Sequence, residues 1–455
     1  MAKAEKANVA TPAQKGNVVA IITMIFLFAM ISFVTNLAAP LGTIWKNSYD
    51  WSGMLGNMMN FLAYLFMGIP AGNLLMRIGY KKTALAAMLV GIIGLIFQWL
   101  SGFVGTETAV FTVAEQAVTL NFVIYLLGAF ICGFCVCMLN TVVNPMLNLL
   151  GGGGNTGNQL VQAGGSFNSL AGTLTPLFVG MLIGQITPET SISNVAPLLY
   201  IAMGVFAFAF LVISAVKIPE PHMGKGGKKV KYSHSPWNFR HTVLGVIGIF
   251  LYVGIEVGIP GVLLFYLSDS AVSGITENAV AVAGGIAAIY WLLMLVGRMI
   301  STVISAKVSS RTQLIVASTV GICLVIAAIV FPGDITVSMP SYSAADGFTT
   351  AQVPAKAMFL VLCGLCTSVM WGGIFNLAVE GLGKYTAQAS GIFMMMVVGG
   401  GVMPLIQNAI ANSAGYMASY WLVVAMLGYL LFYALVGCKN VNKDIPVDDS
   451  VENAL

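Results

Sequence analysis

The chain has 455 residues, of which 58% are hydrophobic and only 8% are charged, and its formal net charge is +4. A soluble globular protein carries about 25% charged residues, so this composition excludes a soluble domain with an ordinary water-exposed surface. The positive charge is small and forms no long basic tract, which excludes a nucleic-acid-binding protein.

Apolar runs of about 20 residues, the length that crosses a bilayer as a helix, recur along the chain. The first run is too long for a signal-peptide core and lacks a suitable cleavage site, so we interpret it as a spanning helix. The predicted spans are residues 18–41, 54–76, 82–103, 118–147, 157–184, 196–217, 241–266, 278–305, 312–331, 355–378, 386–412 and 416–437. The sequence therefore predicts an all-α integral membrane protein of twelve transmembrane helices.

The distribution of basic residues predicts the orientation of these spans. With both termini inside, the inner segments hold the basic central loop and Lys3, Lys6, Lys15, Arg77, Lys81, Lys82, Lys307, Arg311, Lys384, Lys439 and Lys443. The outer loops hold only Lys46 and Lys356. This agrees with the positive-inside rule and predicts a multi-pass protein of the bacterial inner membrane with both termini in the cytoplasm.

A basic loop rich in Pro and Gly, residues 218–240, divides the spans into two sets of six. Such a composition favours a linker over a helix. We therefore expect an N-terminal half at 1–217, a C-terminal half at 241–437 and a cytoplasmic tail at 438–455. A short basic turn follows the second helix of each half, and this repetition indicates two related six-helix units.

The cysteines and histidines give no sign of a metal or redox site. Cys363 and Cys366 have the spacing C-x-x-C, but they lie in an apolar helix without a second pair, which favours buried packing. The three histidines, His222, His234 and His241, lie in or beside the central loop. We therefore expect no metal and no cofactor, apart from a coupling proton or sodium ion.

Polar side chains inside apolar spans indicate where a solute could bind, because they tend to face a cavity or a partner helix. Asn140, Asn144 and Asn148 are spaced by four and share one helix face, and Pro145 frees a backbone carbonyl there. Asparagine both donates and accepts hydrogen bonds, which suits a hydroxyl-rich ligand. Hydrogen bonding between helices is the alternative, and we expect Asn148 to lie near the cytoplasmic end, away from the ligand.

Further polar groups lie in the first, fifth, seventh and eighth spans. Asn36, Gln162 and Asn168 are amides with the same two alternatives. Glu256 is a carboxylate well inside the hydrocarbon, where it binds substrate hydroxyls, carries a proton, or pairs with a base such as Arg298. Three aromatic residues, Tyr290, Trp291 and Trp371, either stack on a sugar ring or pack in the core.

Several stretches resemble the fucose–galactose–glucose:proton symporters, a fucose-permease-like branch of the major facilitator superfamily. They are Phe33-Val34-Thr35-Asn36-Leu37, Pro70-Ala71-Gly72 with Arg77-Ile78-Gly79-Tyr80-Lys81-Lys82, Asn144-Pro145, Ser166-Phe167-Asn168-Ser169, Tyr252-Val253-Gly254-Ile255-Glu256-Val257 and Glu380-Gly381-Leu382-Gly383-Lys384-Tyr385-Thr386, then Val398-Gly399-Gly400-Gly401 and Pro404. The resemblance implies the major facilitator fold, sugar uptake driven by protons, and a sugar-contacting role for Asn168.

The chain departs from that pattern at acidic positions. The superfamily signature after the second helix has an aspartate where this chain has Met76. Two family carboxylates, usual handles for proton and sugar, are replaced by Ala39 and Asn140. Glu256 could take over coupling, another ion could couple, or the protein could be a facilitator.

We therefore predict a monomeric permease that imports a monosaccharide by alternating access, and not an enzyme. Its predicted substrate site comprises Asn36, Asn140, Asn144, Gln162, Asn168 and Glu256, with Glu256 as the candidate for ion coupling. The alternatives are a facilitator or exporter of another small solute on the same fold, and a membrane-embedded transferase, for which clustered acids, histidines or a metal site are lacking.

Overall fold

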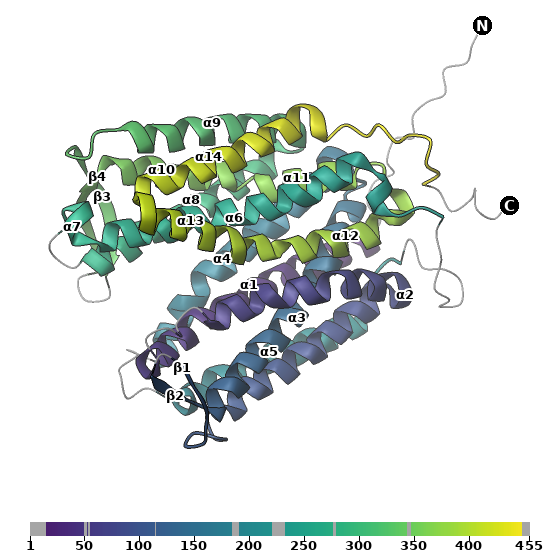
Figure 1. The fold of residues 1–455 in the computed structure, drawn as a ribbon. Coiled ribbons are helices and arrows are strands. Elements are labelled where there is room, and N and C mark those ends of the chain that lie inside the picture. The colour runs from purple at the N-terminus through teal and green to yellow at the C-terminus, as the bar shows by residue number, and fades with distance from the viewer. Residues whose placement is uncertain are drawn as a thin grey trace, which may run out of the picture.

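The computed structural model describes residues 15–49, 52, 55–113, 115–183, 191–220, 233–275, 279–343 and 347–447. Long helices dominate these residues and form two lobes (Figure 1). The first lobe contains α1 (Lys15–Ser48), α2 (Leu55–Leu100), α3 (Leu120–Leu150), α4 (Gly154–Ile183) and α5 (Ala196–Ala215). The second contains α6 (Arg240–Ser268), α7 (Ser270–Ser273), α8 (Ala279–Ile304), α9 (Ser310–Val330), α10 (Ala355–Thr367), α11 (Met370–Val379), α12 (Thr386–Met395), α13 (Gly399–Ala414) and α14 (Tyr416–Phe432).

The expected helical membrane fold is confirmed, and the count of twelve spans stays a prediction. Among the residues that the structure describes, ten helical segments are long and apolar enough to cross a membrane. One of them, Met58–Leu100, has 43 residues and covers two predicted spans. The helix α4 is not among the ten, but its 30 residues cover the described part of the predicted span 157–184. The predicted span 355–378 consists of α10 and α11, and 386–412 consists of α12, the short turn η4 (Met396–Val398) and α13.

The chain reverses within α2 at Gly79, whose backbone has φ 82° and ψ 176°. Side chains other than glycine rarely adopt this φ, so the residue type permits the break. Before the break, Gly56 lies against Tyr125 near the start of α3, and after it Trp99 donates to the hydroxyl of Tyr200 near the start of α5. Both ends of α2 therefore lie at the same end of the lobe, and Gly79 lies at the other.

Two β-hairpins, which the sequence analysis did not anticipate, mark one end of the molecule. The strands β1 (Ala109–Val113) and β2 (Gln116–Thr119) pair antiparallel in the first lobe, and β3 (Thr336–Ser343) and β4 (Gly347–Pro354) pair in the second. We name this the hairpin end. The opposite end, which carries Gly79 and the described termini of the chain, is the terminal end (Figure 1).

The lobes contact each other along α2 with α12 and along α4 with α8. In the first of these contacts the helices approach closely because glycines face each other. A methyl group added at Gly72 would lie 3.0 Å from the Cα of Gly391, and one added at Gly391 would lie 2.6 Å from the carbonyl oxygen of Gly68. Small residues four apart commonly allow such contacts in membranes. The half boundaries at 217 and 241 stay predictions, since most of the linker lies outside the described residues.

Candidate functional site

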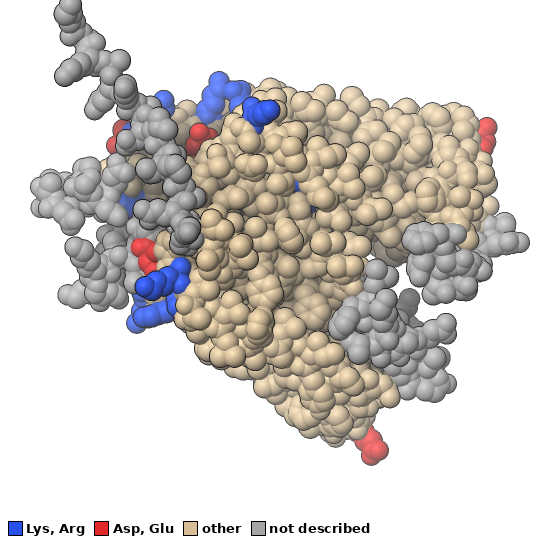
Figure 2. All heavy atoms as spheres, turned by 180° about the vertical axis from the view of Figure 1, so that it is seen from behind, with Lys and Arg blue, Asp and Glu red and all other residues tan. Residues whose placement is uncertain are grey.

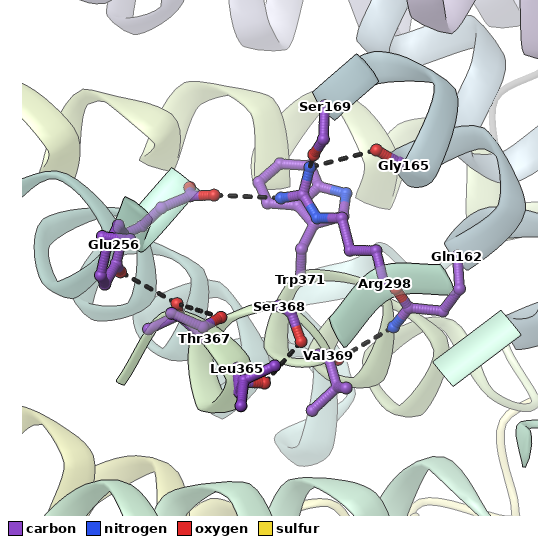
Figure 3. A network of polar contacts seen from close by, with 12 residues as sticks. Gln162, Gly165, Ser169, Glu256, Arg298, Leu365, Thr367, Ser368, Val369 and Trp371 are labelled. Atoms are coloured by element: carbon purple, nitrogen blue, oxygen red, sulfur yellow. Dashed lines mark hydrogen bonds and ion pairs between the residues drawn. The ribbon is translucent and has the colours of Figure 1, made fainter. Parts of the chain in front are cut away.

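Polar side chains from both lobes meet between α4, α6 and α8, and a shared guanidinium lies at their centre (Figure 3). Arg298 on α8 donates from Nη2 to Oε1 of Glu256 on α6 over 3.0 Å. Its Nη1 crosses to the first lobe and donates to the hydroxyl of Ser169 at 2.6 Å and to the carbonyl of Gly165 at 3.2 Å. The side chains of Arg298 and Glu256 are only 10% and 16% exposed, so the pair is held away from bulk water.

Aromatic residues border this ion pair in the second lobe. The rings of Tyr252 and Trp371 lie 6.1 Å apart. The indole Nε1 of Trp371 crosses to the first lobe and donates to Oδ1 of Asn144 over 3.0 Å. Tyr290 is fully buried and its hydroxyl lies 2.9 Å from that of Thr367. Tyr252 is fully buried as well, so of these rings only that of Trp371 is partly exposed. An aromatic face beside amides and a carboxylate is a combination that suits a polar ring compound.

The three asparagines of α3 are all buried and all have partners. Asn140 donates to the hydroxyl of Tyr64 at 2.8 Å, and Asn144 donates to the carbonyl of Asn140 at 2.9 Å. Asn148 donates to Oδ1 of Asn376 on α11 at 2.6 Å. The stripe thus runs from a contact inside the first lobe to a contact between lobes.

The carbonyl that Pro145 leaves without its helical donor belongs to Thr141, four residues earlier. Ser390 on α12, in the other lobe, donates its hydroxyl to this carbonyl over 3.2 Å. The proline therefore creates an acceptor on the interface, and the second lobe uses it.

The amides of α1 and α4 use their nitrogens within the protein. Asn36 donates to the carbonyl of Ser32, Gln162 donates across the interface to the carbonyl of Val369, and Asn168 donates to the carbonyl of Phe28 on α1. No donor among the described residues reaches the side-chain oxygens of Asn36, Gln162 and Asn168. These three oxygens are therefore available to accept a hydrogen bond from a ligand.

The predicted site residues thus fall into two groups. Asn144, Gln162 and Glu256 belong to the network between the lobes. Asn36 and Asn168 lie where α1 packs on α4, and Asn140 lies one turn behind Asn144. Their roles in binding stay predictions, because the geometry defines contacts and not a bound solute.

Sequence reasoning missed several members of the interface. Asn376 contacts Asn148, and Asn158 donates to the hydroxyl of Ser305 over 3.0 Å. Asn376 lies inside the apolar span 355–378, and this position was the available signal. The pairing itself joins residues 228 positions apart, which helix periodicity cannot reveal.

Two other features bear on the site. Within the described ranges no group of three or more His, Cys, Asp or Glu side chains is placed to hold a metal ion, and Cys363 and Cys366 are buried free thiols. A shallow pocket of about 430 Å³ opens at the hairpin end of the second lobe. It is lined by Phe265, Ser268, Asp269, Asn408, Asn412 and Tyr416, none of which belongs to the interface network.

Comparison with known proteins identifies the fold and the family. Residues 19–404 match the family model described as Major Facilitator Superfamily. The chain belongs to the major facilitator superfamily. It is 30% identical to a glucose/galactose transporter of Brucella abortus over 438 residues, which cover 94% of this chain and 97% of that protein.

Two further comparisons agree with the assignment to the major facilitator superfamily. A putative glucose/galactose transporter of Helicobacter pylori is 29% identical, with 93% of this chain and 98% of that protein covered. The crystal structure of the Escherichia coli fucose:proton symporter superposes with a TM-score of 0.75 at 17% identity, covering 92% of this chain and 98% of that one. The two-lobed facilitator fold is therefore shared along nearly the whole chain.

Proposed function

We propose that this chain is a secondary transporter that imports a monosaccharide such as glucose, galactose or fucose by alternating access. The observation that carries the proposal is the available amide oxygen of Gln162 between the two lobes, in the same network as the Glu256–Arg298 ion pair and Trp371. The available oxygens of Asn36 and Asn168 lie in the first lobe, where α1 packs on α4. Sugar hydroxyls donate to such oxygens, and sugar rings stack on aromatic faces. The similarity to two glucose/galactose transporters supports the same substrate class.

The contacts between the lobes support alternating access. Asn148–Asn376 and Asn158–Ser305 lie at the ends of their helices and hold the lobes together at the terminal end. Toward the hairpin end the visible outline of the two lobes diverges (Figure 2). Transporters with two repeats alternate by rocking one unit on the other about a central site, and this state is closed at the terminal end.

The charge distribution supports an orientation with the terminal end in the cytoplasm. On the face shown in Figure 2, Lys and Arg side chains gather at the terminal end together with some acidic ones, while the charged side chains visible at the opposite end are acidic. Arg77, Lys82, Lys307 and Arg311 belong to the terminal-end group by their place in the fold. We propose that this transporter lies in the bacterial inner membrane, and the positive-inside rule then puts both termini inside and the closed end toward the cytoplasm.

Transport assays on purified protein in proteoliposomes test the proposal. We expect uptake of radiolabelled glucose, galactose or fucose when the lumen is more alkaline than the outside. Replacing Asn168 by Ala removes one hydrogen bond to the sugar and should raise the KM roughly tenfold. Glu256→Gln should abolish accumulation against a gradient while sparing sugar exchange, because the neutral amide keeps hydrogen bonding but cannot carry a proton.

A matched control uses an amide far from the lobes' interface. Gln352 on β4 is exposed at the hairpin end, so Gln352→Ala should transport like the parent. Thermal unfolding separates a lost contact from a lost fold, since Asn168 also supports α1 through Phe28. Unchanged uptake in both Asn168→Ala and Glu256→Gln would remove the site assignment, and no uptake of any sugar by the parent would remove the substrate class.

A further inference from the structure

The guanidinium of Arg298 is shared between a carboxylate of its own lobe and two oxygens of the opposite lobe. In the part of the chain that the structure describes, Glu256–Arg298 is the one ion pair within the helical core. Glu256 thus fixes one edge of the guanidinium plane, and the other edge points at Gly165 and Ser169. Arginine can serve two directions at once because its donors form a rigid planar fork.

We propose that Arg298 is a latch between the lobes, which holds the terminal end closed while Glu256 is ionised and releases it when Glu256 takes up a proton. The inference rests on the proposed function, which it deepens by naming how the coupling ion acts. It makes Arg298 a positioning residue, since it acts through α4 and need not touch the sugar.

The release follows from the energetics of buried charge. With Glu256 ionised, the guanidinium is paired, and the pair is tolerated away from water. With Glu256 protonated, the guanidinium would stay buried as an uncompensated charge, which is strongly unfavourable. Its long, flexible stem lets it turn toward water on the hairpin side, and this movement breaks its bonds to Gly165 and Ser169.

The helices packed around Glu256 bring few other titratable groups to this pair. Tyr252 on α6 and Tyr290 on α8 face the carboxyl, Cys363 on α10 faces Tyr290, and Tyr420 on α14 faces Cys363. Phenols and thiols are neutral near pH 7. Glu256 is therefore the acid of this cluster, and a proton that reaches it from the hairpin side would be released at the terminal side after the lobes rock.

The state of the latch can be measured as a distance across the terminal end. Lys82 in the first lobe and Lys307 in the second are exposed there and lie on opposite sides of the interface. Both are replaced by spin-labelled cysteines in a Cys323→Ser background. Of the seven native cysteines, Cys323 is exposed and would also take the label, whereas the other six are buried. Pulsed dipolar spectroscopy in lipid nanodiscs, without sugar, then gives the populations of the closed and open terminal end.

We expect the parent to be mostly closed at about pH 8 and to gain open population at about pH 5, where carboxyls bind protons. Glu256→Gln should raise the open-to-closed ratio roughly fivefold at about pH 8, which is the effect of losing about one hydrogen bond. It should also remove the pH response, because the amide does not titrate. Arg298→Lys should open the terminal end at both pH values, because the compact ammonium of lysine lacks the planar fork whose two nitrogens serve Glu256 and α4 separately. Ser169→Ala, a milder variant, should give a smaller opening and covers the case in which Arg298→Lys does not fold.

The control is another arginine of the second lobe. Within the described ranges Arg311 donates to the carbonyls of Ala434 and Leu435 in its own lobe and to no group of the other lobe, so Arg311→Lys should keep the parent distances. The latch is overturned if Glu256→Gln matches the parent at both pH values, or if Arg298→Lys and Ser169→Ala leave the terminal end closed. The distance measurements use no sugar, so their outcome does not depend on the result of the uptake assay. A failed uptake assay would instead contradict the proposed substrate class.

Discussion

At the scale of single residues, the amides of this chain show two ways to place polarity in an apolar helix. Asn148 and Asn376 satisfy each other across the interface, whereas Asn36, Gln162 and Asn168 commit their nitrogens and keep an oxygen available. The first kind holds a conformation together. The second kind offers acceptors to a solute.

The Asn148–Asn376 contact should therefore contribute to closure of the terminal end more than to sugar affinity. Asn148→Ala, Asn376→Ala and the double variant form a cycle whose coupling we expect to be about 0.6 kcal/mol, a typical value for hydrogen bonds between membrane helices. Thermal unfolding and the terminal-end distance measure it. Additive single variants would show that the 2.6 Å contact has no energetic weight.

Pro145 shows what the sequence could and could not reveal about the site. The residue type alone predicts a carbonyl without a helical donor, and the structure identifies it as that of Thr141. Its partner, Ser390, lies 249 positions away, so only the packing of the two lobes brings them together. The same limit hid the contact of Asn144 with Trp371. Local chemistry was predictable, and partners from the other half were not.

At the scale of elements, the second segment of α2 is capped from a distant part of the chain. Both oxygens of Glu220, just after α5, accept from backbone N–H groups beyond Gly79: those of Tyr80 at 2.7 Å and Lys81 at 2.9 Å. A carboxylate there satisfies helix donors without partners and complements the helix dipole. The superfamily signature has an aspartate in this turn, at the position that Met76 occupies here. Glu220 therefore supplies a carboxylate to a turn that lacks the aspartate of the signature.

Replacing Glu220 by Gln should destabilise the turn by about 1 kcal/mol, because the amide keeps one acceptor but loses the charge. Hydrogen exchange of residues 80–83 and the midpoint of thermal unfolding should both report it. Asp334→Asn is the control, since Asp334 is exposed at the hairpin end. Equal exchange in parent and variant would show that the turn is held by Gly79 and packing alone.

At the scale of the whole molecule, periodic apolar runs were enough to predict the helices, because a spanning segment must satisfy its own backbone. They could not predict the two hairpins, whose strands pair outside the lobes at the hairpin end. They also could not show that α10 and α11 separate near Ser368 or that η4 interrupts the span 386–412. These breaks depend on contacts between helices, which hydrophobicity does not record.

The proposed orientation predicts which loops face the outside of the cell. A cysteine at Gln352 should react with an impermeant maleimide on intact cells, whereas one at Lys443 should react only after the membrane is permeabilised. The Cys323→Ser background again removes the exposed native thiol. Labelling of position 443 on intact cells would reverse the topology and place the closed terminal end outside.

The glycine crossing of α2 on α12 has a mechanical consequence. Where Gly72 meets Gly391, backbone touches backbone, and no side chain has to leave one rotamer for another when the helices tilt. This contact keeps α2 and α12 together through many close backbone contacts, but it opposes rotation of one helix against the other very little. The energy barrier to rocking one lobe on the other would then come from polar contacts such as those of Arg298 and Asn148, and not from side-chain packing where α2 crosses α12.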